Sequence, residues 1–359
     1  MIYTITTIFS FILDKKRTQE GMIECIKQSL NALLVKSDVS LSVIAVFTTH
    51  LKMRGVTIPV KKLYFVLKVA FIILVFGRSF SMFSQTNTET WIHTTHLKMT
   101  QIEQGNSYIT FPWDIGNIED LITETNINPS FVVRENDRAH LMMVLTPQII
   151  LRLFNSYSSP VKTPSYMPHL TIYYSIGDST SRKMHSIFLR FEHHSNGQQS
   201  STYLPTGELN LDSGDFSTNY FEPGIIRAFY YKPFKKVLFF ESSFEIHMKN
   251  HTQPQILGKY ALYKWNNRFS IVSPPKFFHK KGDYQVDIRL NWSFGDINQW
   301  SPCYYKRLTL DLTFFYRPKF FSEIGLFVRY YLGMDYYNIY FDHHLSVIRF
   351  GLMTPLLRF

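Results

Sequence analysis

From about residue 139 onward, apolar and polar side chains alternate along the chain in a series of separate segments. This period of two places the apolar side chains on one face of a β-strand, whereas an amphipathic helix needs a period near 3.6. No segment of the sequence shows a sustained helical period. The clearest alternating segments are 184–195, 238–248, 284–294, 307–316 and 323–332, and further candidates cover roughly 139–155, 169–176, 217–231, 259–271 and 344–359. The pattern predicts an all-β fold.

The alternating segments are about 10 residues long, which is enough for a tilted strand to cross a bilayer. One face of each segment is apolar and often aromatic, and the chain has 32 Phe and 22 Tyr residues. Aromatic residues at segment ends are typical of the interfacial girdles of membrane barrels. We therefore expect a transmembrane antiparallel β-barrel of about 12 strands in the outer membrane of a Gram-negative-type envelope. The alternative is a soluble secreted β-sandwich that serves as a binding module, because a sandwich shows the same alternation.

The two ends of the chain carry patterns typical of export and assembly. Two lysines precede an apolar run at 63–77, and small residues follow it. This order predicts a secretory signal peptide with cleavage near Ser81 or Ser84. At the other end, the segment 355–359 finishes in phenylalanine, which resembles the assembly signal of bacterial outer-membrane barrels.

These patterns divide the chain into four parts. We expect residues 1–52 to be an over-extended leader outside the fold, with translation starting at Met53. Residues 53–84 are then the signal peptide, 85–106 a polar linker and 107–359 the barrel domain. The alternative is that the first 52 residues are a genuine but unusual leader.

The net charge of +11 favours contact with anionic partners. A basic balance suits nucleic acid, an anionic membrane surface or simply a basic protein surface. The sequence contains no nucleic-acid-binding module, so we expect membrane phospholipids rather than nucleic acid as the partner.

A histidine and a serine end the apolar face of the segment 184–197. On a strand, His193 and Ser195 share the face of Ile187, Leu189 and Phe191. Serine is a weak nucleophile until a neighbouring base accepts its proton, and two residues along a strand place such a base within reach. On the lipid-facing side of a barrel, this pair can reach an ester at the membrane surface.

The third member of a catalytic triad orients the base. The next candidate strand begins near Ser217, and antiparallel pairing would bring Asn219 beside His193, where its amide oxygen can accept from the imidazole. Arg227 falls on the same alternation, unless Pro223 and Gly224 form a bulge that resets the register.

The motif His193-His194-Ser195-Asn196-Gly197 resembles the His-x-Ser-Asn-Gly motif of the outer membrane phospholipase A family. Two further segments are similar to that family in the same order. Ser158-Ser159-Pro160, followed by residues 165–168, is similar to its Ser-Ser-Pro segment, and residues 108–114 look like its mature N-terminal segment. The resemblance covers roughly residues 107–359.

The resemblance implies a calcium-dependent phospholipase A1 or A2 that hydrolyses acyl esters of glycerophospholipids as a homodimeric twelve-stranded barrel. His193 would be the base, Ser195 the nucleophile and Asn219 the orienting residue. The calcium ligands would include Ser158 and the backbone carbonyl of Gln198. The competing interpretation is a catalytically silent outer-membrane barrel, either a pore or a structural protein.

Two departures from the family pattern concern the segment before Asn219. A longer loop at 199–216 replaces the family's short acidic loop, so either Asp215 or Ser213 could supply the remaining calcium ligand. We assign it to Asp215. The tryptophan that precedes the asparagine in the family is Thr218 here.

Overall fold

The computed structural model describes residues 102–134, 141–176, 183–231, 236–272, 283–318, 320–321 and 324–354. All the described residues belong to one compact unit, Thr88–Phe359. The expected leader and signal peptide, the linker up to residue 101 and the chain end at 355–359 lie outside the described residues.

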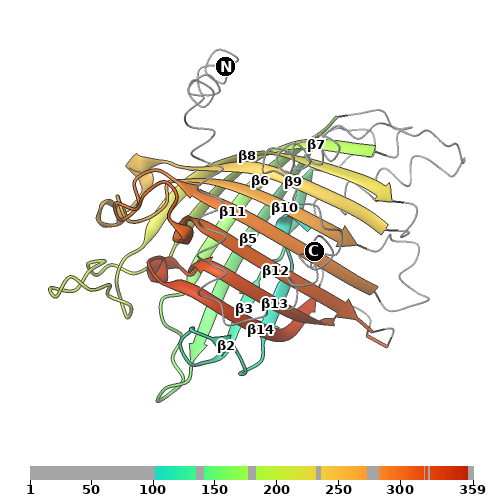
Figure 1. Ribbon diagram of the computed structural model, residues 1–359. Helices are drawn as coiled ribbons and strands as arrows, with labels where there is room; N and C mark the ends of the chain where they lie inside the picture. The colour runs from blue at the N-terminus through green and yellow to red at the C-terminus, as the bar shows by residue number, and fades with distance from the viewer. Residues whose placement is uncertain are drawn as a thin grey trace, which may run out of the picture. The chain divides into compact units, whose positions relative to one another are not determined.

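The described residues form one 14-stranded antiparallel sheet with short connecting 3₁₀ helices (Figure 1). The strands are β1 (Ser107–Thr110), β2 (Ile115–Gly116), β3 (Leu121–Ile127), β4 (Phe131–Arg134), β5 (Leu141–Phe154), β6 (Ser165–Ile176), β7 (Lys183–Ser195), β8 (Ser217–Tyr231), β9 (Lys236–His247), β10 (Tyr263–Val272), β11 (Asp283–Phe294), β12 (Leu308–Arg317), β13 (Gly325–Met334) and β14 (His344–Thr354). The 3₁₀ helices are η2 (Lys249–His251), η3 (Pro254–Ile256), η5 (Tyr305–Arg307) and η6 (Asn338–Tyr340).

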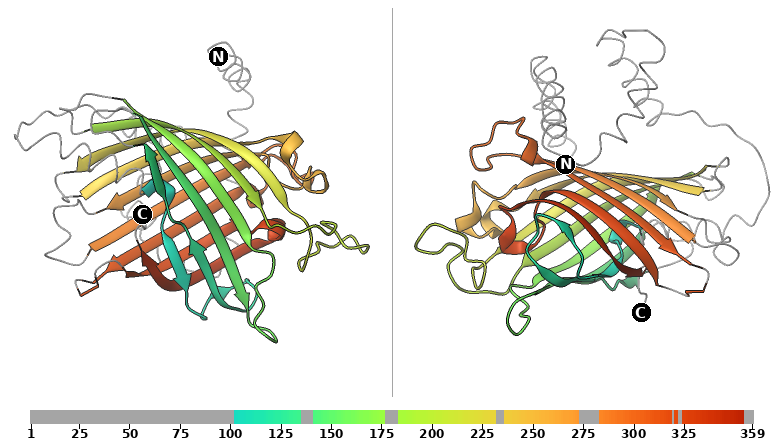
Figure 2. Two further views of the ribbon diagram at one scale, coloured as in Figure 1. Left: turned by 180° about the vertical axis from the view of Figure 1, so that it is seen from behind. Right: turned by 60° about the horizontal axis from the view of Figure 1, so that its bottom comes forward.

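The sheet closes on itself into a barrel. Strands from β5 to β14 pair with their neighbours in chain order, β3 pairs with both β5 and β1, and β1 pairs with β14. The short strands β2 and β4 pair beside this ring, which leaves twelve strands in the described barrel. The expected fold class and strand number are confirmed, and Figure 2 shows the tilted strands from two further sides.

The two faces of the barrel wall differ as the alternation predicts. On β7, Ile187, Leu189 and Phe191 are between 41% and 46% exposed on the outside, while Ser186 and Glu192 are each 2% exposed on the inside. The same apolar-out, polar-in arrangement holds for the exposed aromatic and aliphatic residues of β11, β12 and β13. A closed, even-stranded antiparallel barrel with an apolar exterior and a polar interior is the form of bacterial outer-membrane proteins. The chain is therefore an outer-membrane β-barrel of a Gram-negative-type envelope.

Within the described ranges, no helix is long and apolar enough to cross a membrane.

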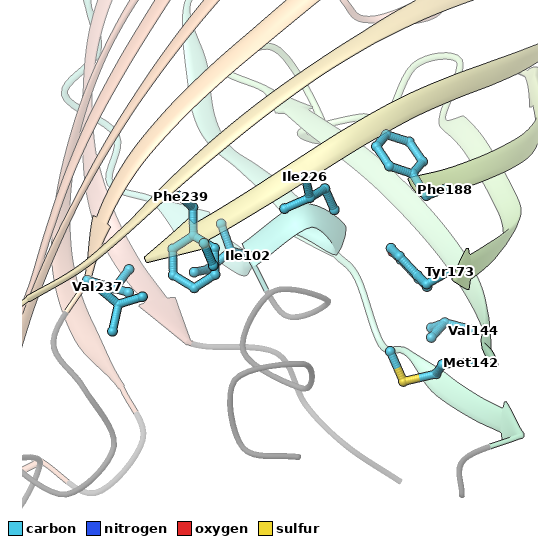
Figure 3. Packing of buried hydrophobic residues seen from close by; sticks show 10 residues of the cluster. Ile102, Met142, Val144, Tyr173, Phe188, Ile226, Val237 and Phe239 are labelled. Carbon is cyan, nitrogen blue, oxygen red and sulfur yellow. The ribbon is translucent and has the colours of Figure 1, made fainter. Parts of the chain in front are cut away.

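Residues 102–106, which the sequence analysis assigns to a polar linker, lie inside the barrel. Ile102 belongs to a hydrophobic cluster with residues of β5 to β10 (Figure 3). Glu103 forms an ion pair with Arg190, and the Gln104 amide donates to the Tyr173 hydroxyl at 2.5 Å. The side chain of Arg268 also donates to the Ile102 carbonyl. The fold thus begins before residue 107, because buried partners on the barrel wall hold this segment.

Among the described residues, the long loops at 155–164, 196–216, 248–262, 295–307 and 335–343 lie at one end of the barrel, which we call the loop end (Figure 1). Side chains of these loops fold inward there and form a second hydrophobic cluster, which includes Phe216, Ile256, Tyr337, Ile339 and Phe341. Between this cluster and Gln104 lies a polar cavity of about 360 Å³.

Buried ion pairs cross the lumen near the loop end. The Arg152 guanidinium donates to Glu124 at 2.7 Å and to both carboxylate oxygens of Asp335 at 2.6 and 2.8 Å. Arg349 forms an ion pair with Glu124 as well, and all four side chains are at most 2% exposed. The network links β3, β5 and β14 with the loop that carries Asp335.

We expect Arg152→Ala to lower the free energy of unfolding of the barrel by about 3–5 kcal/mol, because it leaves buried carboxylates without their cation. Urea unfolding in detergent, followed by tryptophan fluorescence, measures this change. The matched control is Lys162→Ala, which removes the exposed Lys162–Asp212 pair and should cost about 0–1 kcal/mol. Equal losses of unfolding free energy in the two variants would show that the buried ion pairs of Arg152 do not stabilise the barrel more than an exposed pair does.

Candidate active site

Strands β7 and β8 position the predicted site residues, and they keep one register along their whole length. Pro223 and Gly224 lie opposite Leu189 and Phe188, so the bulge that the sequence left open does not form. A β-carbon at Gly224 would lie 2.4 Å from the Phe188 ring. Glycine at this position therefore makes room for the inward phenylalanine, and Arg227 stays on the outer face.

The single register makes His193 and Asn219 direct cross-strand partners. The imidazole Nδ1 of His193 lies 2.7 Å from the Asn219 amide oxygen, and its Nε2 lies 3.0 Å from the Ser195 hydroxyl oxygen. The structure thus brings together the three residues that the sequence analysis selected, in the order hydroxyl, imidazole, amide.

The hydrogen bonds also fix the proton on the imidazole. An amide oxygen only accepts, so Nδ1 of His193 carries the hydrogen and donates it to the hydrogen bond with Asn219. In the neutral imidazole, Nε2 is then the acceptor nitrogen and can take the proton of the Ser195 hydroxyl. This tautomer is the one that a general base for serine requires.

The site lies on the outer, lipid-facing surface at the loop end of the barrel. Phe191 and Phe221 pack against each other below it, with ring centroids 5.2 Å apart. Phe221 also pairs with Ile246 of β9, and all three side chains are between 37% and 41% exposed. These apolar side chains continue from the triad toward the middle of the barrel wall.

The side chain of Asn196 fixes the backbone around the triad, a role that the sequence analysis did not assign. Its amide nitrogen donates to the Gly214 carbonyl at 2.7 Å, and its oxygen accepts from the backbone N–H of Phe216 at 3.0 Å and of Gln198 at 3.3 Å. Asn196 is 1% exposed. It therefore joins the end of β7 to the segment that leads into β8. Its place in the five-residue motif was the only sequence signal for this role.

Glycine follows Asn196 for a conformational reason. Gly197 has a φ of 66°, a left-handed backbone conformation that glycine adopts without steric cost. A β-carbon there would also lie 3.4 Å from the Tyr166 ring. The chain can thus turn away from the strand immediately after the motif.

Two predicted calcium ligands lie on the pair of segments that Asn196 joins. Gln198 follows the motif, and the Asp215 backbone N–H donates to the Ser200 carbonyl at 2.9 Å. The Asp215 carboxylate accepts from the Gln253 amide at 2.8 Å, and burial raises the pKa of this carboxyl above its ordinary value. The alternative ligand Ser213 instead hydrogen-bonds with Asn210.

The third predicted ligand lies on a different loop. Ser158 is exposed in the turn between β5 and β6, with a φ of 64° that is uncommon for a residue with a β-carbon. The ion pair from Lys162 to Asp212, at 2.6 Å, connects this loop with the 199–216 loop. In the part of the chain that the structure describes, no group of three or more His, Cys, Asp or Glu side chains could hold a metal ion.

The sequence matches no protein-family model, and comparison with curated proteins gives no match either. Among solved structures, the chain is similar to outer membrane phospholipase A from Escherichia coli, with 13% identity over 70% of this chain and 90% of that chain and a TM-score of 0.47. The dimeric, calcium-bound outer membrane phospholipase of Salmonella typhi gives 12% identity, the same coverage and a TM-score of 0.47. A porin mutant from Rh. blastica gives 6% identity, 69% and 98% coverage and a TM-score of 0.25. The barrel assignment rests on the strand pairing of this chain itself.

Proposed function

We propose that this barrel is a phospholipase A1 or A2 that hydrolyses acyl ester bonds of glycerophospholipids in the outer membrane. The observation that carries the proposal is the position of His193, hydrogen-bonded to Asn219 on one side and Ser195 on the other, on a surface that faces lipid. Polar groups that face lipid are energetically costly. A purely structural barrel wall would therefore have no need of a serine, an imidazole and an amide in series on its outer face.

The residues suit a two-step acyl transfer. His193 Nε2 takes the Ser195 proton while the serine oxygen bonds to the ester carbonyl carbon, and Asn219 stabilises the imidazolium through Nδ1. When the carbon–oxygen bond to the glycerol breaks, His193 gives its proton to the leaving alkoxide, and a lysophospholipid departs. Water, deprotonated by His193, then releases the fatty acid and restores Ser195.

The surroundings of the triad favour a lipid substrate. An ester at the membrane interface would lie beside Ser195, and its acyl chain could extend along Phe191, Phe221 and Ile246. A water-soluble ester would gain nothing from this exposed apolar surface, whereas a membrane lipid already lies against it.

Calcium is the cofactor that the available donors would suit. Hydroxyl, carbonyl and carboxylate oxygens are hard ligands, which calcium prefers over nitrogen or sulfur. Ser158, the Gln198 carbonyl and Asp215 would hold the ion, with Ser158 supplied by the partner subunit of a homodimer. When bound, calcium would supply positive charge for the oxyanion that forms at the ester carbonyl.

A catalytically silent barrel, either a pore or a structural protein, is the competing function. The lumen gives little support to a pore, because Ile102 to Gln104 and the inward cluster around Phe216 and Tyr337 occupy its two ends. Buried ion pairs such as Arg152 with Asp335 cross the space between them.

Fatty-acid release from phospholipid micelles separates the two functions. We expect the purified barrel to release fatty acid and lysophospholipid, and His193→Ala to lower the rate about 10⁴-fold. A matched control is His251→Ala, an exposed histidine whose side chain is outside the triad. A wild-type barrel that is folded and inert with calcium present would favour the silent barrel.

A further inference from the structure

A second hydrogen-bonded series lies on the inner side of the wall, directly behind the triad. The Thr218 hydroxyl is 2.7 Å from His247 Nδ1, and His247 Nε2 is 2.5 Å from a carboxylate oxygen of Glu245. Lys264 donates to the same Glu245 oxygen at 2.6 Å. Because the carboxylate only accepts, His247 donates to it from Nε2.

This inner series has the residue types of a hydrolase triad, but it has no access for a substrate. Thr218 is 0% exposed and His247 is 3% exposed. The Thr218 hydroxyl is also 2.9 Å from the Thr252 hydroxyl, so its position is fixed from two sides. A buried, fully paired group of this kind restrains the backbone that carries it.

The restrained backbone is that of Asn219. Thr218 points inward and Asn219 outward from adjacent positions, so the inner hydrogen bonds hold the segment that carries the triad amide. The Thr252 hydroxyl donates to the Met248 carbonyl at 3.0 Å, and the Met248 N–H donates to the Asn219 carbonyl at 2.8 Å. The Asn219 amide nitrogen also lies 3.4 Å from the His251 carbonyl. The start of β8, which follows a long loop, is thereby fixed to β9 and η2.

We propose that Thr218, His247 and Glu245 are positioning residues, which act through Asn219 to keep its amide oxygen against His193. This inference rests on the proposed hydrolase function and adds to it an inner layer of the site. It also accounts for a threonine before the asparagine: a short hydroxyl side chain fits the buried space between His247 and Thr252.

A double-mutant cycle between Thr218 and Asn219 tests whether Thr218 acts through the Asn219 amide. We expect Thr218→Val to lower kcat about tenfold with KM within about twofold, since a small displacement of an orienting group affects the rate of the chemical step. In the Asn219→Ala background, adding Thr218→Val should lower kcat by a further factor of less than about two, because the side chain through which Thr218 acts is gone. Thr218→Ser, which keeps the hydroxyl, should restore most of the activity.

Thr146→Val is the matched control, because Thr146 is also 0% exposed and hydrogen-bonded inside the lumen, but contacts Gln104 and Ser130. It should leave kcat unchanged. Heat-modifiable mobility on gels shows whether Thr218→Val folds. If it does not fold, Thr252→Val is measured instead in the wild type and in Asn219→Ala. It should lower kcat in the wild type and have little further effect in Asn219→Ala.

The outcomes distinguish this inference from the function on which it rests. An active wild-type barrel with unchanged kcat in Thr218→Val, or with the same loss in both backgrounds, overturns the positioning role and leaves the hydrolase standing. A folded wild-type barrel without hydrolysis overturns the proposed function and this inference with it.

Discussion

Ser195→Ala is expected to abolish the release of fatty acid from phospholipid micelles, with a loss in kcat of about 10⁴-fold or more. The reason is that the Ser195 hydroxyl, 3.0 Å from the imidazole Nε2 of His193, is the group that would form the acyl-enzyme. The barrel should still fold, because Ser195 is half-buried at the end of β7 and its backbone pairing with Ser217 does not involve the side chain.

Ser217 provides the matched control for this experiment. It lies opposite Ser195 on β8, on the same outer face, and is half-buried as well. Ser217→Ala should keep its activity, and a sulfonyl fluoride should label Ser195 alone in the wild type, as mass spectrometry of the digested protein would show. Full activity in Ser195→Ala, or labelling at Ser217 instead, would exclude Ser195 as the nucleophile.

The sequence predicted the wall of the barrel well, for a physical reason. Each strand has one face toward lipid and one toward the lumen, so a period of two reports directly on the two environments. The same reasoning placed His193 and Ser195 on one face, and antiparallel pairing placed Asn219 near them. The uncertain point was the register beyond Pro223, since a bulge there would have turned Arg227 to the other face.

The residues that the sequence could not reveal are those whose partners are distant along the chain. Gln104 contacts Thr146, His169 and Tyr173, and nothing in the local pattern around Gln104 distinguishes a lumen segment from a polar linker. The interactions of Thr218 with His247 and Thr252 are hidden in the same way. Alternation says which face a side chain occupies, but the hydrogen-bond partner depends on the register of several strands and on how the loops fold inward.

The calcium ligands show the same limit. Gln198 was chosen because it directly follows the motif, and Asp215 because it lies in the loop before Asn219; the hydrogen bonds of Asn196 hold these two segments together. Ser158 lies on another loop, and the assignment of all three to one ion remains a prediction. A ligand from a second subunit leaves no trace in the alternation of a single chain.

Removal of calcium is expected to stop hydrolysis and to dissociate the dimer together. If Ser158 of one subunit completes the site formed by Gln198 and Asp215 of the other, the ion binds only the dimer and stabilises it by mass action. Excess chelator should therefore lower the rate at least about 100-fold, the scale expected when oxyanion stabilisation is lost. Analytical ultracentrifugation in detergent should show a shift from dimer to monomer over the same range of free calcium.

Ser158→Ala tests whether one residue produces both effects. It should raise the calcium concentration needed for half-maximal activity and, by the same factor, the concentration needed for dimer formation, because the two equilibria share one ligand set. Ser156→Ala is the matched control: Ser156 is an exposed serine on the same turn and has no assigned role in binding. A monomer that hydrolyses phospholipid at the full rate in excess chelator would contradict the calcium-bridged dimer. The series from Ser195 through His193 to Asn219 would survive that result, since its hydrogen bonds lie within one chain.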